Sequence, residues 1–149
     1  MQRATTIERI RQTGLTVVLF LLLMATACQD DDPKPDELAD IYAGVQTGAW
    51  QITYFFDEQD ETAQFDSYIF VFNDDKTVVA TRDTKAVAGT WEVVAGSTHP
   101  KLVLDFAIIE PFDELNDDWE IQEYTESKMI LQDVSGGNAE IDYLTFEKQ

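Results

Sequence analysis

The chain has 149 residues, of which 29 are acidic and ten are basic, and its formal net charge is −19 at pH 7. So negative a chain repels nucleic acid and anionic lipid surfaces, which excludes both as electrostatic partners. The single cysteine excludes an internal disulfide, and the length allows for one hydrophobic core.

The first 27 residues have the layout of a secretory signal peptide. A positive start is followed by a largely apolar run, and small residues then precede Cys28. In order, these features are Arg3, Arg9, Arg11, the run 15–24, Ala25 and Ala27. A membrane-spanning helix needs about 20 apolar residues, so this run is too short for a permanent span. Residues 1–27 are therefore not expected to belong to the folded domain.

The segment Ala25-Thr26-Ala27-Cys28 resembles a bacterial lipobox. The resemblance implies that Cys28 is the first residue of the mature chain and carries acyl chains. Two or more such chains anchor a protein stably in a membrane. Ordinary signal-peptidase cleavage after Ala27 is the alternative, and it would leave Cys28 as a free thiol.

The next residues, Gln29-Asp30-Asp31-Asp32, resemble the acidic export signal behind the lipid-bearing cysteine of Bacteroidota surface lipoproteins. This resemblance implies display on the outer face of the outer membrane, with an inner-leaflet lipoprotein as the alternative. Loss of the signal peptide removes three basic residues and one acidic residue, so the mature chain has a formal charge of −21.

Residues 28–46 are predicted to be a tether that ends in a short helix. The acids and the prolines Pro33 and Pro35 favour a disordered, extended tether. Acidic residues at the start of 36–42 suit one or two helical turns, and Gly44 and Gly48 are expected to end them.

Residues 47–149 form the predicted domain, in which apolar residues recur with a period of two. This alternation and the intervening turns predict eight β-strands. The expected strands are 50–56, 65–72, 77–82, 87–94, 101–109, 119–124, 127–132 and 140–147. In the first strand, Trp50, Ile52, Tyr54 and Phe56 are expected to share one apolar face.

Most connecting loops are too short to hold a crossover helix, so the strands are predicted to be antiparallel. Gly136-Gly137 suits a hairpin turn between the last two strands. Eight up-and-down strands can close into a barrel, which leaves no unpaired sheet edge. The fold class is therefore all-β, an eight-stranded antiparallel up-and-down barrel, and a two-sheet β-sandwich is the alternative.

Three motifs follow one another in an order similar to that of lipocalin-like domains in small bacterial lipoproteins. They are Gly48-Ala49-Trp50, the hairpin segment 70–75, and Gly89-Thr90-Trp91-Glu92-Val93. The resemblance covers residues 47–147 and implies a calycin-type barrel. Ligands of such domains are diverse, and the resemblance transfers no catalytic residue.

No catalytic residue, metal ligand or cofactor is predicted. His99 is the only histidine, and it lies in a Thr-His-Pro loop without a motif that would hold a nucleophile beside it. Acidic residues gather in 57–61, 73–75 and 116–118, but none of these segments has the spacing of an EF-hand loop. They are interpreted as solvated loop charge, and the protein is predicted not to be an enzyme.

A small apolar or amphipathic ligand in the barrel mouth is the first functional hypothesis. An eight-stranded barrel has room inside for side chains or for one small ligand. Trp50, Trp91 and Arg82 are the candidate ligand-binding residues, and Arg82 would offer its guanidinium to an acidic head group if it points inward. The alternative is a surface interaction or accessory protein, in which aromatic side chains fill the barrel and a partner meets its outside.

Overall fold

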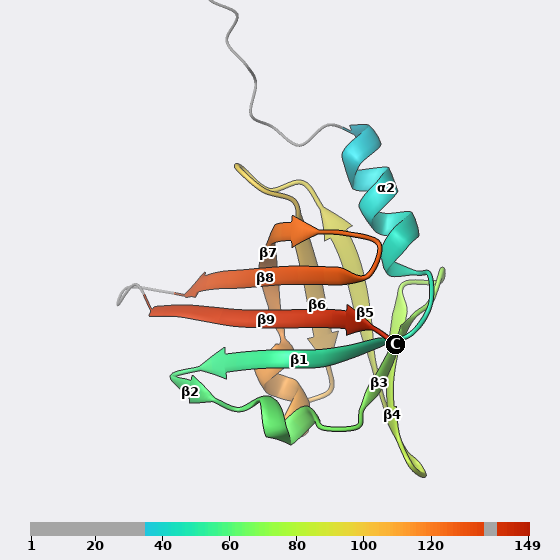
Figure 1. Cartoon of the computed structure of the whole chain (residues 1–149), viewed down its shortest axis with the longest axis vertical. Helices are drawn as coiled ribbons and strands as arrows, with labels where there is room; N and C mark the ends of the chain where they lie inside the picture. Colours follow the sequence, from blue (N-terminus) through green and yellow to red (C-terminus); the bar gives the residue numbers. More distant parts are fainter. Residues whose placement is uncertain (1–34, 136–139) are drawn as a thin grey trace, which may run out of the picture. The chain divides into compact units, whose positions relative to one another are not determined.

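The computed structural model describes residues 35–135 and 140–149, which belong to one compact unit, Asp31–Gln149 (Figure 1). The predicted signal peptide, Cys28, the acidic tract and the Gly136-Gly137 turn lie outside the described residues and stay predictions. In the described part of the chain, no helix is long and apolar enough to cross a membrane.

The described residues form an α-helix, nine strands and two short 3-10 helices. In chain order they are α2 (Pro35–Val45), β1 (Trp50–Asp57), β2 (Gln59–Asp60), η1 (Thr62–Phe65), β3 (Ile69–Phe72), β4 (Thr77–Arg82), β5 (Lys85–Val94), β6 (Lys101–Phe106), η2 (Phe112–Leu115), β7 (Asp117–Tyr124), β8 (Lys128–Ser135) and β9 (Glu140–Lys148).

Eight of these strands close into an antiparallel barrel, which confirms the predicted fold class. Neighbours follow the chain from β3 to β9, and β9 returns to pair with β1 through six residue pairs. The pairing between β1 and β3, which completes the barrel, is shorter, since Trp50 and Phe70 are the only residues paired there. The short strand β2 pairs only with the end of β1. One sheet thus returns to its first strand, and a two-sheet sandwich does not form.

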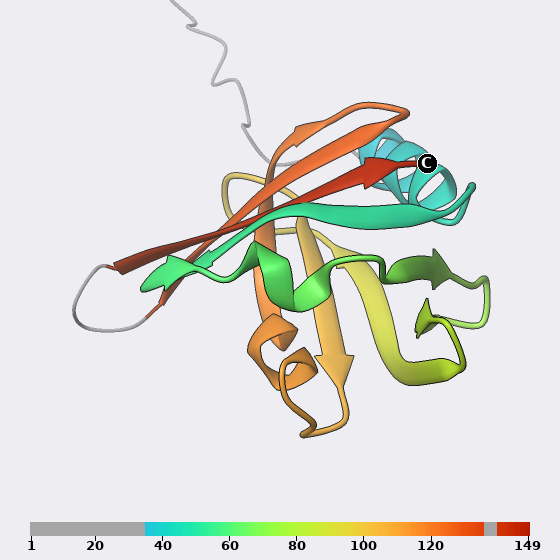
Figure 2. The ribbon, with the colours of Figure 1, turned by 60° about the horizontal axis from the view of Figure 1, so that its bottom comes forward.

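The predicted short helix is confirmed as α2, which packs beside the barrel end where β1 begins (Figures 1 and 2). Ile41 and Val45 are buried in the same core as the strands. Gly44 lies inside the helix instead of ending it. A Cβ at this position would be 1.6 Å from the Tyr124 hydroxyl, so glycine lets the tyrosine ring approach the helix.

The predicted face of the first strand is wrong beyond Ile52. The pairing of β1 with β9 shifts between Ile52 and Tyr54, which leaves Thr53 as an extra residue in the strand. Such a bulge exchanges the two faces of the strand. Phe55 is therefore buried, while Tyr54 is exposed and Phe56 is only partly covered.

The strand predicted over 65–72 is shorter than expected. Its first half belongs to η1 and a turn in which Ser67 has φ 65°, a left-handed conformation that interrupts an extended strand. Phe65 and Tyr68 are nevertheless buried. Apolar residues of this segment therefore reach the core without joining the sheet.

The strand predicted over 101–109 also ends early, at Phe106, and Ile108, beyond its end, is 89% exposed. The side chain of Asn116 takes the place of a strand neighbour at this point. Its amide nitrogen donates to the Phe106 carbonyl at 3.1 Å, and its oxygen accepts from the Phe106 N–H. The chain can therefore leave the sheet with its last backbone groups satisfied.

Candidate functional site

Trp50, a predicted ligand-binding residue, is fully buried at the start of β1. Its indole Nε1 donates a hydrogen bond to the Val45 carbonyl at 2.9 Å, at the end of α2. The Lys148 ammonium lies 4.8 Å from the centre of the ring. The only polar atom of this side chain is thus bonded by the protein itself, and the ring is covered.

Trp91 on β5 is also buried beneath α2. Tyr42 of the helix stacks on its ring with 4.9 Å between ring centres, and Phe72 meets it edge-on at 5.4 Å. Its indole Nε1 donates to the Asn73 carbonyl at 3.0 Å. Trp50 and Trp91 therefore both contact α2. The helix occupies the position at this end of the barrel where a ligand was predicted.

Arg82 lies at the other end of β4 from Trp91. It pairs with Lys85, whereas Thr77 at the start of β4 pairs with Thr90, next to Trp91. At roughly 3.3 Å per residue, this places Arg82 about 16 Å along the strand from that pair. The structure does not bring the three predicted residues together.

Two contacts hold the guanidinium of Arg82. Its Cζ lies 4.1 Å from the centre of the Tyr68 ring, and its Nη1 donates to the Asp66 carbonyl at 3.2 Å. These contacts fasten the turn before β3 to the end of β4. The side chain is partly exposed and has a structural role.

Aromatic side chains in mutual contact fill the barrel interior. Phe70 alone packs against Phe106, Phe112 and Phe146, with ring centres 5.3 to 6.4 Å apart. The described apolar core forms one continuous cluster that includes all three tryptophans. Close packing of this kind leaves little free volume.

The end of the barrel away from α2 has a different chemistry. Four aspartates from four strands meet there, Asp57 on β1, Asp117 on β7, Asp133 on β8 and Asp142 on β9, and we call them the acidic mouth. Each aspartate lies two positions from a buried residue of its own strand, and side chains two positions apart point to the same face of a sheet, so each aspartate has the inward phase. These buried residues are Phe55, Trp119, Leu131 and Leu144.

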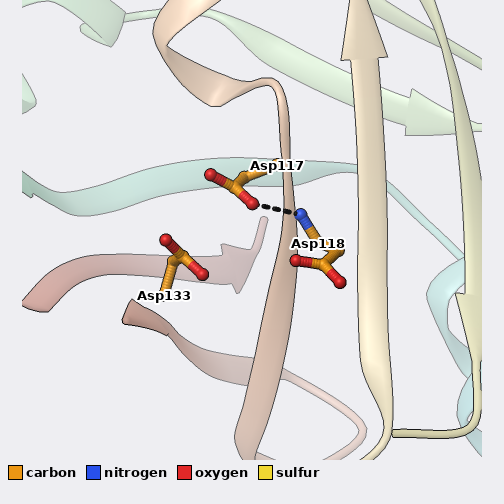
Figure 3. Close-up of side chains that lie close together, drawn as sticks. All are labelled: Asp117, Asp118 and Asp133. Carbon is orange, nitrogen blue, oxygen red and sulfur yellow. Dashed lines mark hydrogen bonds between the residues drawn. The ribbon is translucent and has the colours of Figure 1, made fainter. Parts of the chain in front are cut away.

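Three carboxylates at this end are close together, as Figure 3 shows. Oxygen atoms of Asp117, Asp118 and Asp133 all lie within 4.8 Å of one another. The backbone N–H of Asp118 donates to the Asp117 carboxylate at 2.6 Å. Asp133 is buried and is paired across the sheet with Asp142. Negative charge is therefore concentrated where the barrel interior begins.

The pKa values of these groups follow their surroundings. Burial raises the pKa of Asp117, and the charge of Asp133 adds to this, although the hydrogen bond from Asp118 acts in the opposite direction. Burial also raises the pKa of Asp142, followed by the charges of Asp57 and Asp133. By contrast, a hydrogen bond from Lys101 lowers the pKa of Asp118. Asp117 and Asp142 therefore hold their negative charge at an energetic cost.

Glu114 on η2 extends this acidic end. Burial raises its pKa to about 7, and a hydrogen bond with Glu61 and the charges of Glu61, Asp113 and Asp57 contribute further. A carboxyl group with such a pKa is partly protonated near neutral pH. This end of the barrel can therefore take up a proton close to pH 7.

The acidic mouth can bind protons or cations, because each neutralises the repulsion between its carboxylates. Asp117, Asp118 and Asp133 could supply oxygen ligands to a hard divalent cation. Ca²⁺, for example, is coordinated by about six to eight oxygen atoms. Asp117 and Asp118 were predicted to be solvated loop acids, and Asp133 and Asp142 were not predicted as site residues. The sequence pattern that could have identified Asp133 and Asp142 is their spacing of two residues from the buried Leu131 and Leu144.

A pocket of about 310 Å³ lies on the α2 side, lined by Gly44, Thr47, Tyr124, Glu126 and Lys148. Trp50, Trp91 and Arg82 do not line it. The predicted loop histidine, His99, has its Nδ1 3.8 Å from a Glu120 carboxylate oxygen, and within the described residues no serine hydroxyl is bonded to it. No protein-family model matches the sequence, and no curated protein matches it significantly.

Proposed function

We propose that the chain is a non-enzymatic outer-membrane lipoprotein that displays a filled, lipocalin-like barrel at the cell surface and acts through the outside of that barrel. The observation that supports this proposal is the burial of the aromatic side chains in one core cluster. Trp50 and Trp91 have their indole N–H groups bonded to backbone carbonyls of the chain, and α2 covers them. The side chains available to a partner are then those on the outer surface.

Membrane attachment rests on Cys28, with acyl chains as the anchor and the acidic tract behind it as the surface-export signal. Only six residues separate Cys28 from the first residue of α2. At about 3.4 Å per residue, the stretched segment spans roughly 25 Å. The barrel would therefore stay close to the bilayer. The strongly negative charge of the chain disfavours binding to nucleic acid or to anionic lipid.

A small apolar ligand in the barrel mouth is the weaker proposal. To reach Trp50 and Trp91, such a ligand would have to displace α2, breaking the Tyr42–Trp91 stack and the hydrogen bond to Val45. At the opposite end it would meet the acidic mouth, which disfavours an apolar or anionic molecule.

The anchor is tested by mass spectrometry of the N-terminal peptide of protein extracted from its own membrane. We expect Cys28 as the first residue, carrying acyl chains. Protease treatment of intact cells should then digest the barrel, and replacing Asp30, Asp31 and Asp32 with alanine should protect it. An unmodified Cys28 would contradict the anchor, and protection of the native chain would contradict surface display.

The filled barrel is tested by native mass spectrometry of the same extracted protein. We expect the mass of the acylated chain with no additional bound molecule. A small molecule bound at one per chain, and lost from Trp91→Ala, would favour the ligand-binding hypothesis instead.

A further inference from the structure

The outer face of the barrel carries an exposed apolar surface across three neighbouring strands. It consists of Tyr54 and Phe56 on β1, Ile141 and Tyr143 on β9, and Ile130 and Val134 on β8, and we call it the outer stripe. The cross-strand pairs Phe56–Tyr143 and Val134–Ile141 place these side chains beside one another. Tyr54 and Ile130 flank Thr145 in the next row.

This composition is unusual for the solvent-facing side of an antiparallel sheet, which normally alternates to polar residues. Tyr54, Val134, Ile141 and Tyr143 are each between 37% and 51% exposed. The rings of Phe56 and Tyr143 are in edge contact at 6.4 Å. Thr145, although on the outside, is buried between its neighbours. Gln132, which pairs with Tyr143, interrupts the outer stripe on β8, whereas on β1 and β9 its apolar residues lie next to one another.

Negative charge borders the outer stripe. Glu123 on β7 is exposed and pairs with Ile130, and Glu120 pairs with Gln132 in the same outer phase. Glu58 follows the end of β1 and is exposed. The nearby cation Lys128 is already 3.1 Å from the Glu147 carboxylate. A partner for this surface is therefore favoured if it brings apolar groups together with positive charge.

We propose that the outer stripe docks an amphipathic basic segment of another protein, with its apolar side chains on Tyr143 and Ile141 and its lysines or arginines toward Glu123 and Glu58. This inference rests on the proposed function, in which a filled barrel acts through its outside. A second copy of the chain fits poorly, because it would bring the same acidic border and a charge of −21. The chain's own segment 30–32 is likewise acidic and repelled.

The test uses the full mature protein in nanodiscs of zwitterionic lipid, with the signal of empty nanodiscs subtracted. Three labelled 18-residue peptides serve as probes in fluorescence anisotropy: an amphipathic Leu/Lys peptide, a Ser/Lys peptide of equal charge, and a Leu/Glu peptide. We expect the Leu/Lys peptide to bind about tenfold more tightly than the Ser/Lys peptide, because burial of the stripe adds to the charge attraction. The Leu/Glu peptide should not bind.

The double variant Ile141→Ser/Tyr143→Ser should reduce Leu/Lys binding to the level of the Ser/Lys peptide, with the net charge unchanged. Ile108→Ser is the matched control, because Ile108 is exposed, apolar and outside the stripe. It should bind like the native chain. Equal binding of both lysine peptides, or an unaffected double variant, would overturn the proposal.

Two other outcomes would also overturn it in favour of a different occupant. A dimer in analytical ultracentrifugation that the double variant abolishes would assign the stripe to a second copy. Association with empty zwitterionic vesicles that the double variant abolishes would assign it to lipid. If the native chain is found with an unmodified Cys28 and still binds the Leu/Lys peptide, the proposed anchor is contradicted and the proposed docking surface is not.

Discussion

The two ends of the barrel differ in chemistry although the same strands build both. Trp50 and Asp57 lie at opposite ends of β1, about 23 Å apart at roughly 3.3 Å per residue. The first is buried beneath α2 in an apolar, hydrogen-bonded environment. The second belongs to the acidic mouth, where inward positions carry carboxylates that repel one another.

The comparison shows where the fold is stabilised. At the α2 end, the inward positions continue the core and the helix removes two indole rings from water, which favours folding. At the acidic mouth, strand positions of the same phase carry charge that burial penalises. We therefore expect substitutions at the α2 end to destabilise the protein and charge-removing substitutions at the acidic mouth to stabilise it.

The largest effect is expected from Trp91→Ala, which removes a fully packed indole and the ring on which Tyr42 stacks. Truncation of a buried aromatic residue costs about 3 to 5 kcal/mol of unfolding free energy. Urea unfolding, followed by circular dichroism, measures this loss. Ile108→Ala is the control and should change the unfolding free energy by less than about 0.5 kcal/mol. A loss below about 1 kcal/mol in Trp91→Ala would show that the α2 end is not the stabilising one.

The next effect is expected from Gly44→Ala, because its Cβ would collide with the Tyr124 hydroxyl. Overpacking of this kind costs about 1 to 3 kcal/mol. Tyr124→Phe removes the nearest atom, so the double variant should lose less than the two single variants combined. A double-mutant cycle on urea unfolding measures this coupling. Strict additivity would mean that α2 adjusts freely and is not fixed against the barrel.

Much of the barrel could be predicted because its strands have one apolar face and short loops. Phe70, Trp91 and Phe146 are buried as two-residue alternation requires. The bulge at Thr53 could not be predicted, since Tyr54, Phe55 and Phe56 are all aromatic and either phase looks apolar. Pairing with β9 decides the phase, and a sequence window does not contain that long-range information.

The candidate sites were harder to predict, because function depends on what a side chain meets across strands. Trp50 and Trp91 were expected to face a ligand, but α2 occupies that position, and no local pattern shows which residues a preceding helix will cover. The acidic mouth combines residues of β1, β7, β8 and β9, and the Asp133–Asp142 pair depends on the register of β8 with β9. The outer stripe depends in the same way on the bulge that turns Tyr54 and Phe56 outward.

At the acidic mouth, Asp142→Asn should stabilise the protein at pH 7. It removes a charge that is directly opposite Asp133, and like charges paired across a sheet cost about 0.2 to 1 kcal/mol. Asp105→Asn makes the same charge change at an exposed position of β6 and is the matched control. Thermal unfolding at low and high salt distinguishes them, since the gain of Asp142→Asn should shrink as salt screens the repulsion. Equal gains from both variants would mean that only net charge matters.

The smallest effect is a pH dependence that Glu114 contributes. Its pKa is raised from 4.5 to about 7 in the folded protein, so the folded state binds more protons than the unfolded state between these values. The unfolding free energy should therefore increase as pH falls from 8 to 5, by less than about 1 kcal/mol because solvent screens a half-buried carboxyl group. Glu114→Gln should flatten the profile in this window, whereas Glu92→Gln, on an exposed position of β5, should leave its shape unchanged. If the native profile and the Glu114→Gln profile have the same slope, the acidic end does not take up a proton near pH 7, and the difference between the two ends lies in packing alone.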